Sequence, residues 1–359
     1  MKPTFHTLTV KDIKKETREC CSIAFEVPAE LKEKYQFIQG QYLTLKTTID
    51  GEEVRRSYSI CVGPNEGELR VAVKQMPHGL FSTYANKKLK IGDQLDVMTP
   101  MGNFYTDLKA DNNKHYVAFA AGSGITPMMS IMKAVLYQEP ESSFTLFYGN
   151  KNVSSIIFRE EIEALKNIHI QRLNVHYILS REFLESPLLN GRIDNDKCVT
   201  LIDKFLDLET VDEVFACGPE SMIFAVRDTL AARNFPKEQL HFELFTSPLD
   251  GKVAKKHIVK EEDKEKVTNV TINLDGKAFV FDLPFGSENL LDAALNRGAD
   301  LPFACKGGVC CTCRAKLVEG EVDMQVNYAL EPDEVENGFI LTCQAYPTTE
   351  KVVVDFDQV

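Results

Sequence analysis

The stretch Cys305-Lys306-Gly307-Gly308-Val309-Cys310-Cys311-Thr312-Cys313 carries four cysteines on one short segment, and Cys343 follows farther along the chain. Cys305, Cys310, Cys313 and Cys343 are separated by 4, 2 and 29 residues. Three thiolates on one loop and a fourth from a distant segment form the plant-type ligand pattern of a [2Fe–2S] cluster. The sequence therefore predicts a compact domain built around such a cluster, with these four cysteines as its ligands.

Two other interpretations of these cysteines stay open. Four thiolates also suit structural zinc, although zinc sites usually combine two short knuckles and Cys343 stands alone. A set of disulfides is the second alternative. Gly307 and Gly308 favour the cluster, because they let the loop wrap closely and turn its N–H groups toward sulfur. Cys311 breaks the ligand spacing, so we interpret it as a thiol that packs beside the loop.

Length and composition limit the class of protein. The chain has 359 residues, which predicts two or three domains with separate cores. The segment Met1–Lys15 has no long apolar run or cleavage site, and no later stretch reaches membrane-spanning length. The ten cysteines are therefore expected to be thiols and metal ligands of a cytoplasmic protein without membrane association. The net charge of −12 argues against nucleic acid as a partner.

The negative charge is concentrated in the last part of the chain. Residues 268–359 carry 6 Lys or Arg and 15 Asp or Glu, so −9 of the net charge lies there. Such a surface either serves solvation alone or docks a basic redox partner, and the sequence leaves both open.

Residues 1–110 are predicted to form an antiparallel β-barrel. Alternating or β-rich runs recur between Gly, Pro, Asn and Asp residues, and a short helix is expected after Gly79. About six short strands in this length are typical of a small barrel. The expected strands are Phe5–Val10, Cys21–Val27, Tyr42–Thr47, Tyr58–Cys61, Leu69–Lys74 and Gln94–Met98.

Residues 111–247 instead alternate strands with helices. The apolar strand Tyr116–Ala121 is followed by a Gly-Ser-Gly turn and by an apolar helix over Met128–Tyr137. Such repeats predict an α/β domain with a parallel sheet covered on both faces. Further strands are expected at Phe144–Tyr148, Val175–Leu179, Glu213–Ala216 and Leu240–Phe245, with helices near Phe158–Lys166 and Ser221–Arg233.

The remaining residues are predicted to form a linker and a third domain. Residues 248–267 are rich in Lys, Glu, Pro and Gly without periodicity, which indicates the linker. Residues 268–359 are expected to form a compact α+β (β-grasp) unit. Its signals are a hairpin turn at Asp275-Gly276, a helix over Leu290–Arg297, and strands at Ala315–Val318 and Val352–Phe356.

Two motifs in the first domain point to a flavin nucleotide. Arg56-Ser57-Tyr58-Ser59 ends a β-rich run, and Gly79-Leu80-Phe81-Ser82 opens the short helix. An arginine and a helix N-terminus can together neutralise a pyrophosphate. The tyrosine can stack on a flat ring, and Ser59 can donate to a ring nitrogen. An exposed arginine beside a cross-strand tyrosine is the simpler alternative.

Three motifs in the α/β domain suit a second nucleotide. Gly122-Ser123-Gly124 either places backbone N–H groups next to a phosphate or forms only a tight turn. Ser180-Arg181 ends a later strand, where the guanidinium can bind a 2′-phosphate or simply face solvent. Cys217-Gly218 ends another strand, at the edge where α/β sheets bind ligands. The thiol can lie against a nicotinamide ring, with the glycine leaving room, or fill the core.

These motifs resemble the ferredoxin–NADP⁺ reductase superfamily, fused to a C-terminal plant-type ferredoxin as in oxygenase reductases. The chain is more specifically similar to the reductase components of phenylacetyl-CoA epoxidases. Cys311 departs from the pattern, in which a small residue without a thiol is expected, and this favours oxidation of the site. The segments that carry the resemblance are Gly191–Asp194, Asp292–Leu295, Ala304–Ala315, Asn327–Glu334, Leu341–Gln344 and Val352–Asp357.

The resemblance implies a role for each motif residue. Those expected to bind FAD are Arg56, Tyr58, Ser59, Gly79 and Ser82. Those expected to bind the nicotinamide nucleotide are Gly122, Gly124, Thr126, Cys217 and Gly218, with Ser180 and Arg181 for the 2′-phosphate of NADPH. Ser59 and Cys217 are the expected catalytic residues. Glu243 or Phe245 is expected to close the flavin pocket.

The implied function is electron transfer from NADPH to FAD, then to the [2Fe–2S] cluster, then to a separate di-iron oxygenase that epoxidises phenylacetyl-CoA. No expected helix carries the Glu-x-x-His pair of a di-iron bundle, so the oxygen-activating site must belong to another protein. One alternative is a reductase for an aromatic-ring or steroid hydroxylase. The other is a non-catalytic [2Fe–2S] electron carrier or redox sensor.

Overall fold

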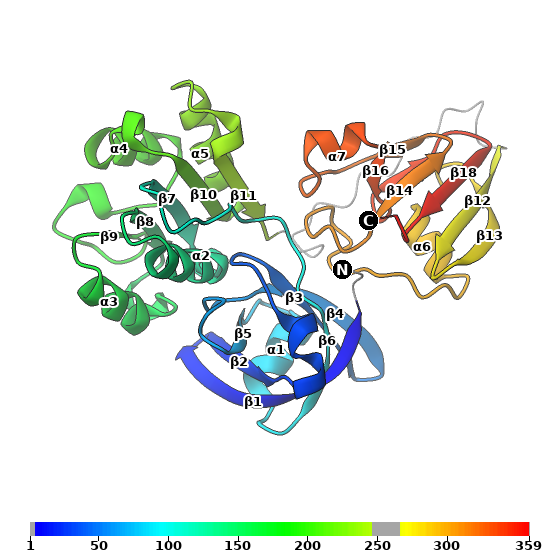
Figure 1. Ribbon diagram of the computed structural model, residues 1–359, viewed down its shortest axis with the longest axis horizontal. Coiled ribbons are helices and arrows are strands. Elements are labelled where there is room, and N and C mark those ends of the chain that lie inside the picture. The colour runs from blue at the N-terminus through cyan, green and yellow to red at the C-terminus, as the bar shows by residue number, and fades with distance from the viewer. Residues whose placement is uncertain (1–3, 246–265, 359) are drawn as a thin grey trace. The chain divides into compact units, whose positions relative to one another are not determined.

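Figure 1 shows the computed structural model, which describes residues 4–245 and 266–358. Within these residues, Phe5–Phe245 forms one compact unit, and residues 266–358 belong to a second. The larger unit contains two separate sheets, each with its own apolar core. Most of the predicted linker, residues 248–265, lies outside the described residues. Among the described residues, no helix is both long and apolar enough to cross a membrane.

The first sheet is the predicted antiparallel barrel. Its six strands follow the order β4-β3-β6-β1-β2-β5, and every neighbouring pair is antiparallel. A bridge between Ile60 and Val71 joins the two outer strands and closes the barrel. Its elements are β1 (Phe5–Thr17), β2 (Cys20–Glu26), β3 (Tyr42–Ile49), β4 (Glu52–Ser59), β5 (Leu69–Lys74), α1 (Leu80–Lys87) and β6 (Gln94–Met98).

The second sheet is fully parallel, in the order β11-β10-β7-β8-β9. Helices α2 and α3 cover one face and α4 and α5 the other, which confirms the α/β prediction (Figure 1). Helix α4 was not predicted, although Cys198, Leu201, Ile202 and Phe205 recur in it at helical spacing. The elements are β7 (His115–Ala121), α2 (Ile125–Gln138), β8 (Ser143–Asn150), α3 (Arg159–Ile168), β9 (Leu173–Leu179), α4 (Asn195–Phe205), β10 (Glu213–Gly218), α5 (Glu220–Ala231) and β11 (Leu240–Leu244).

The second unit contains a five-stranded mixed sheet, in the order β13-β12-β18-β14-β16, and a small pair, β15-β17. The predicted hairpin is present: β12 and β13 pair in register around Asp275 and Gly276, whose φ angles of 55° and 68° define a tight primed turn. The elements are β12 (Val267–Leu274), β13 (Lys277–Pro284), α6 (Leu290–Leu295), β14 (Arg314–Glu319), β15 (Val322–Met324), α7 (Pro332–Glu336), β16 (Phe339–Leu341), β17 (Ala345–Pro347) and β18 (Lys351–Asp355).

Candidate functional site

Three polar side chains from different strands meet where the barrel contacts the parallel sheet. Ser59 ends β4, is buried, and donates a hydrogen bond from Oγ to Oε2 of Glu243 at 3.2 Å. Glu243 lies on β11 directly beside Cys217 of β10 in the parallel register. The two predicted catalytic residues, Ser59 and Cys217, are therefore both neighbours of Glu243 at the carboxyl edge of the sheet.

Burial keeps this junction uncharged at neutral pH. It raises the pKa of Glu243 to about 8, against the opposing effect of the Ser59 hydrogen bond. Burial, followed by the nearby Glu243 carboxyl, also raises the pKa of the Cys217 thiol well above its ordinary value. A neutral carboxyl, a hydroxyl and a thiol can face flat, weakly charged rings without placing a fixed charge against them.

Phe245 and Glu243 are the two alternatives that the sequence offers for this position. The structure places Glu243 at the junction, whereas β11 ends at Leu244 and the Phe245 side chain is 40% exposed. Alternation along the last strand gave a signal for Glu243. Choosing Glu243 over Phe245 required its pairing with Cys217, and that strand register cannot be read from one sequence.

Arg56 and Tyr58 lie on β4 two positions apart and therefore share one face of the strand. The Tyr58 ring packs against Phe81 of α1, with ring centroids 5.4 Å apart. Arg56 donates from Nη1 to the carbonyl of Arg55 at 2.7 Å. The Tyr58 ring is thus partly buried and packed beside the N-terminal end of α1, and the Arg56 side chain is half-buried near this ring.

Gly79 and Ser82 form the entry of α1. A Cβ at Gly79 would lie 2.4 Å from Oγ of Ser82, so a larger residue here would displace the Ser82 hydroxyl. The Ser82 hydroxyl accepts from the N–H of Met76 at 3.1 Å and donates to the carbonyl of Gly79 at 3.4 Å. Ser82 therefore shapes the loop, and the N–H groups of the first helical turn are the donors suited to a phosphate.

The glycine turn after β7 lies directly on the end of β10. A Cβ at Gly124 would lie 2.0 Å from the carbonyl oxygen of Cys217, and one at Gly218 would lie 2.8 Å from Met222. Thr126 donates from Oγ1 to the carbonyl of Ser123 at 3.0 Å, which tightens the turn. The segments 122–126 and 217–218 are thus in contact, and their binding of a nicotinamide nucleotide stays a prediction.

Lys74 is a residue of this site that the sequence prediction missed. Its Nζ lies 3.1 Å from the position that a Cβ of Gly122 would take. Burial, followed by repulsion from Lys151, lowers the pKa of Lys74. A lysine beside a glycine turn with φ of +56° at Gly122 suits an anion such as a pyrophosphate. The only sequence signal for Lys74 was its position at the end of a predicted strand.

Ser180 and Arg181 follow β9, at the far end of the sheet from Cys217. Ser180 donates from both N and Oγ to the carbonyl of Asn150, at 2.9 and 3.2 Å. The N–H of Arg181 donates to the carbonyl of Lys151 at 2.7 Å, and its side chain is exposed. Since β9 lies three strands from β10, about 14 Å separates the two ends, as an extended dinucleotide requires.

The four predicted cluster ligands form two pairs. The thiols of Cys305 and Cys310 contact each other, and so do those of Cys313 and Cys343. The N–H of Gly307 donates to Sγ of Cys305 at 3.2 Å, so the loop amides do turn toward sulfur. The contact with Cys310, followed by these backbone N–H groups, lowers the pKa of Cys305 to about 6.

The paired arrangement fits a two-iron cluster better than a single zinc ion. Around one zinc, all four thiolates converge at about 2.3 Å from the ion. Here the four thiols form two contacting pairs, and each pair suits one iron of a two-iron cluster. Cys311 has φ of 52° and donates from Sγ to the carbonyl of Ala329 at 2.8 Å, away from the two pairs.

Comparison with known proteins agrees with the division of the chain into three predicted domains. Three family profiles match: an oxidoreductase FAD-binding domain over residues 7–105, an oxidoreductase NAD-binding domain over 119–228, and a 2Fe-2S iron-sulfur cluster binding domain over 272–348. The chain is 46% identical to a subunit of the 1,2-phenylacetyl-CoA epoxidase of Escherichia coli, over 99% of this chain and 98% of that one.

More distant relatives also match this chain over nearly its full length. The chain is 33% identical to the ferredoxin reductase component of 3-ketosteroid-9-alpha-monooxygenase of Rhodococcus rhodochrous, over 97% of this chain and 96% of that one. Among solved structures, phthalate dioxygenase reductase covers 98% of both chains with a TM-score of 0.59 and 22% identity, which shows a common fold.

The fold and the site therefore define an oxidoreductase with FAD-binding, NAD-binding and [2Fe–2S] domains, the reductase component of an oxygenase system. The chain belongs to the family of oxygenase reductases that includes this 1,2-phenylacetyl-CoA epoxidase component. The predicted fold class, cofactors and reductase activity are confirmed at this level.

Proposed function

We propose that this protein takes electrons from NADPH and delivers them to a di-iron oxygenase that epoxidises phenylacetyl-CoA. The observation that carries the proposal is the junction of Ser59, Glu243 and Cys217, where the barrel and the parallel sheet meet. Two ring systems bound on either side of this junction would lie face to face. The 46% identity to the Escherichia coli epoxidase component supports the choice of partner.

The barrel, residues 1–110, would hold FAD. Tyr58 supplies an immobile ring for stacking, because Phe81 supports it from behind. Arg56 and the first turn of α1 supply positive charge for the pyrophosphate, and Gly79 and Ser82 fix the loop at that turn. Ser59 presents its hydroxyl at the reacting end of the flavin.

The parallel-sheet domain, residues 111–247, would hold NADPH along its carboxyl edge. Cys217 and Gly218 receive the nicotinamide, and glycine at 218 lets the end of β10 pack closely, since a Cβ there would lie 2.8 Å from Met222. The turn at Gly122 and Gly124, with Thr126 and Lys74 beside it, receives the phosphates. Ser180 and Arg181, which follow β9, would bind the 2′-phosphate.

FAD held by the barrel would supply the conversion of a two-electron hydride into single electrons, which a [2Fe–2S] cluster held by the four cysteines would carry. Glu243 contributes a proton-holding group beside Ser59, because its raised pKa keeps the carboxyl protonated at neutral pH. Within residues 268–359, the two cysteine pairs would each bind one iron, and the amides of the loop stabilise negative charge on sulfur.

The oxygenase partner is tested by reconstitution. The visible spectrum of the anaerobic protein should show flavin and cluster absorbance, and both should bleach on addition of NADPH. NADPH-driven epoxidation of phenylacetyl-CoA should then require added di-iron oxygenase subunits. A steroid 9-alpha-hydroxylase serves as the competing acceptor, since a relative with 33% identity serves such an enzyme. Turnover with the steroid system alone would reject the proposed partner.

A further inference from the structure

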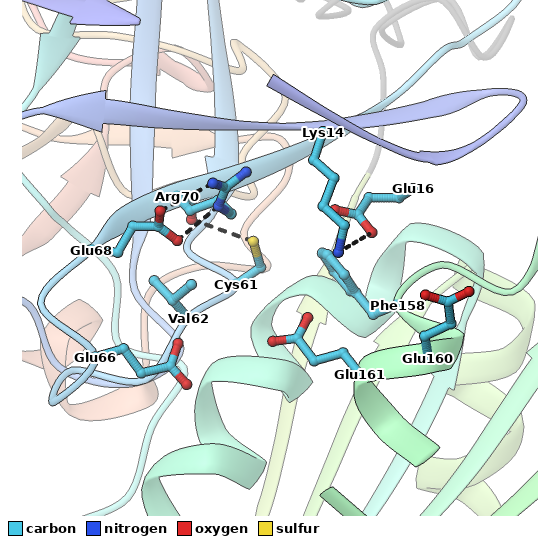
Figure 2. Close-up of a pocket in the computed structure, with 10 residues that line it drawn as sticks. All are labelled: Lys14, Glu16, Cys61, Val62, Glu66, Glu68, Arg70, Phe158, Glu160 and Glu161. Carbon is cyan, nitrogen blue, oxygen red and sulfur yellow. Dashed lines mark hydrogen bonds and ion pairs between the residues drawn. The ribbon is translucent and has the colours of Figure 1, made fainter. Parts of the chain in front are cut away.

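A buried lysine joins the barrel to the parallel-sheet domain, and its two carboxylate partners line a pocket of the larger unit. The pocket has a volume of about 410 Å³ and is lined from the barrel by Cys61, Val62 and Glu66, and from the other domain by Phe158 and Glu161 (Figure 2). The side chain of Lys133, on α2, is only 7% exposed. Burying an ammonium group is costly unless carboxylates pair with it, so its partners carry information.

Lys133 binds one carboxylate from each domain. Nζ lies 2.9 Å from Oε2 of Glu66, on the loop between β4 and β5 of the barrel, and 2.5 Å from Oε1 of Glu161, on α3 of its own domain. Burial alone lowers the pKa of Lys133, but the attraction of the two carboxylates outweighs it and raises the pKa overall. The lysine therefore remains charged and paired.

Other contacts fix the same loop to the same helix. The buried hydroxyl of Ser130 donates to the carbonyl of Val62 at 2.7 Å. A Cβ at Gly63 would lie 3.4 Å from Cβ of Lys133, so the barrel loop passes directly over the helix. Ser130 and Lys133 are three positions apart and face the loop together.

The two segments in this contact are each continuous in sequence with a part of the junction of Ser59, Glu243 and Cys217. The loop that carries Glu66 continues from Ser59 at the end of β4, and the helix that carries Lys133 begins at the turn of Gly124. Seven residues of helix, about 10 Å, separate Lys133 from Thr126. Because closely packed helices and strands move as rigid bodies, a shift at Lys133 moves Gly124 and Cys217 relative to Ser59.

We infer that the Lys133–Glu66 ion pair is a positioning device: it sets the orientation of the nicotinamide site relative to the flavin site and so controls the rate of hydride transfer. The inference rests on the proposed function. Lys133 and Glu66 would touch neither cofactor, and Glu161 only helps to neutralise Lys133 within one domain. This division provides a matched pair of variants, Glu66→Gln and Glu161→Gln.

The test measures flavin reduction by NADPH in the full-length holoprotein by anaerobic rapid mixing. A misplacement of about 1 Å can cost roughly 100-fold in rate, so Glu66→Gln should slow reduction by roughly 10- to 100-fold. The long-wavelength absorbance of the NADPH–FAD complex should weaken with it, while the KM for NADPH changes little. Glu161→Gln should stay within about twofold of the wild-type rate, because the link between the domains remains.

Further variants separate positioning from simple stability. Lys133→Met should slow flavin reduction as much as Glu66→Gln does, and the variant with both substitutions should be no slower than either alone. Lys133→Arg should be faster than Lys133→Met, because it keeps the positive charge. FAD content and melting temperature are measured for each. Equal rates for Glu66→Gln and the wild type, equal losses for the two glutamine variants, or losses that follow FAD content would each overturn the inference. A wild type that NADPH fails to reduce would instead reject the proposed function.

Discussion

Replacing Arg181 with alanine tests which nucleotide the protein uses. Arg181 follows β9, its backbone N–H donates to Lys151, and its side chain is exposed. Within the described residues, its guanidinium makes no ion pair with a carboxylate that a ligand would have to displace. On the proposed assignment this exposed guanidinium binds the 2′-phosphate, so its removal should affect only the nucleotide that carries one.

The size of the effect follows from one contact. A hydrogen bond between charged groups contributes about 1.5–3 kcal/mol, which corresponds to roughly 10- to 150-fold in affinity. Because the Arg181 side chain is exposed, solvent screening places the expected loss near the lower end of that range. Arg181→Ala should thus lower kcat/KM for NADPH by roughly 10- to 30-fold and leave kcat/KM for NADH within about twofold.

The assay is steady-state reduction of ferricyanide with each nucleotide, since this acceptor takes electrons without the oxygenase. Inhibition by 2′,5′-ADP and by 5′-ADP measures the same contact at equilibrium. Arg227→Ala is the matched control, because Arg227 is an exposed arginine of the same domain that pairs with Asp228 on α5. Equal losses with both nucleotides, or a wild type that prefers NADH, would refute the assignment of Arg181.

Three further predictions concern the cluster, the flavin junction and the partner. Cys313→Ser should remove iron and the visible cluster absorbance, while Cys311→Ser retains both; the reverse result contradicts the ligand assignment. Because the pKa of Glu243 is raised to about 8, the wild type loses stability as pH rises from about 4.5 toward 8, so Glu243→Gln should raise the melting temperature more at pH 8.5 than at pH 5.5; a pH-independent difference argues against a buried carboxyl. Charge reversal at Asp333 and Glu336 should slow electron delivery to the oxygenase by roughly 10-fold at low salt but not ferricyanide reduction, and an effect that persists above about 0.5 M salt would exclude steering.

The sequence predicted elements well where a local signal dictates the backbone. The turn at Asp275-Gly276 needs two residues with positive φ, and both adopt it. The spacing of the cluster cysteines and the glycine turn at Gly122 likewise specify their geometry locally. Helix α4 (Asn195–Phe205) was missed even though its signal is local, because Cys198, Leu201, Ile202 and Phe205 follow the i, i+3, i+4, i+7 spacing of an amphipathic helix.

The parts of the site that were not predicted depend on contacts between distant segments. Lys74 is one of many lysines in the sequence, and only the fold places it beside Gly122. Glu334 likewise looks like surface charge in the sequence. In the structure it pairs with Arg314 at 3.2 Å and accepts from the N–H of Glu331, so it stabilises α7 instead of facing a partner. Such roles follow from tertiary register, which a single sequence does not encode locally.

The pairing of β12 with β18 has a consequence for when the cluster can be assembled. These strands are adjacent and parallel, yet β12 ends at Leu274 and β18 begins only at Lys351. The side chain of Asp357 also accepts from the N–H groups of Asp275 and Gly276. At roughly 5–20 residues per second, the ribosome needs about 4–15 s between the two strands. Cys305, Cys310 and Cys313 are made within that interval, before the sheet around them can be completed. Insertion of iron must therefore wait until synthesis is nearly complete, or these thiols must be protected until then.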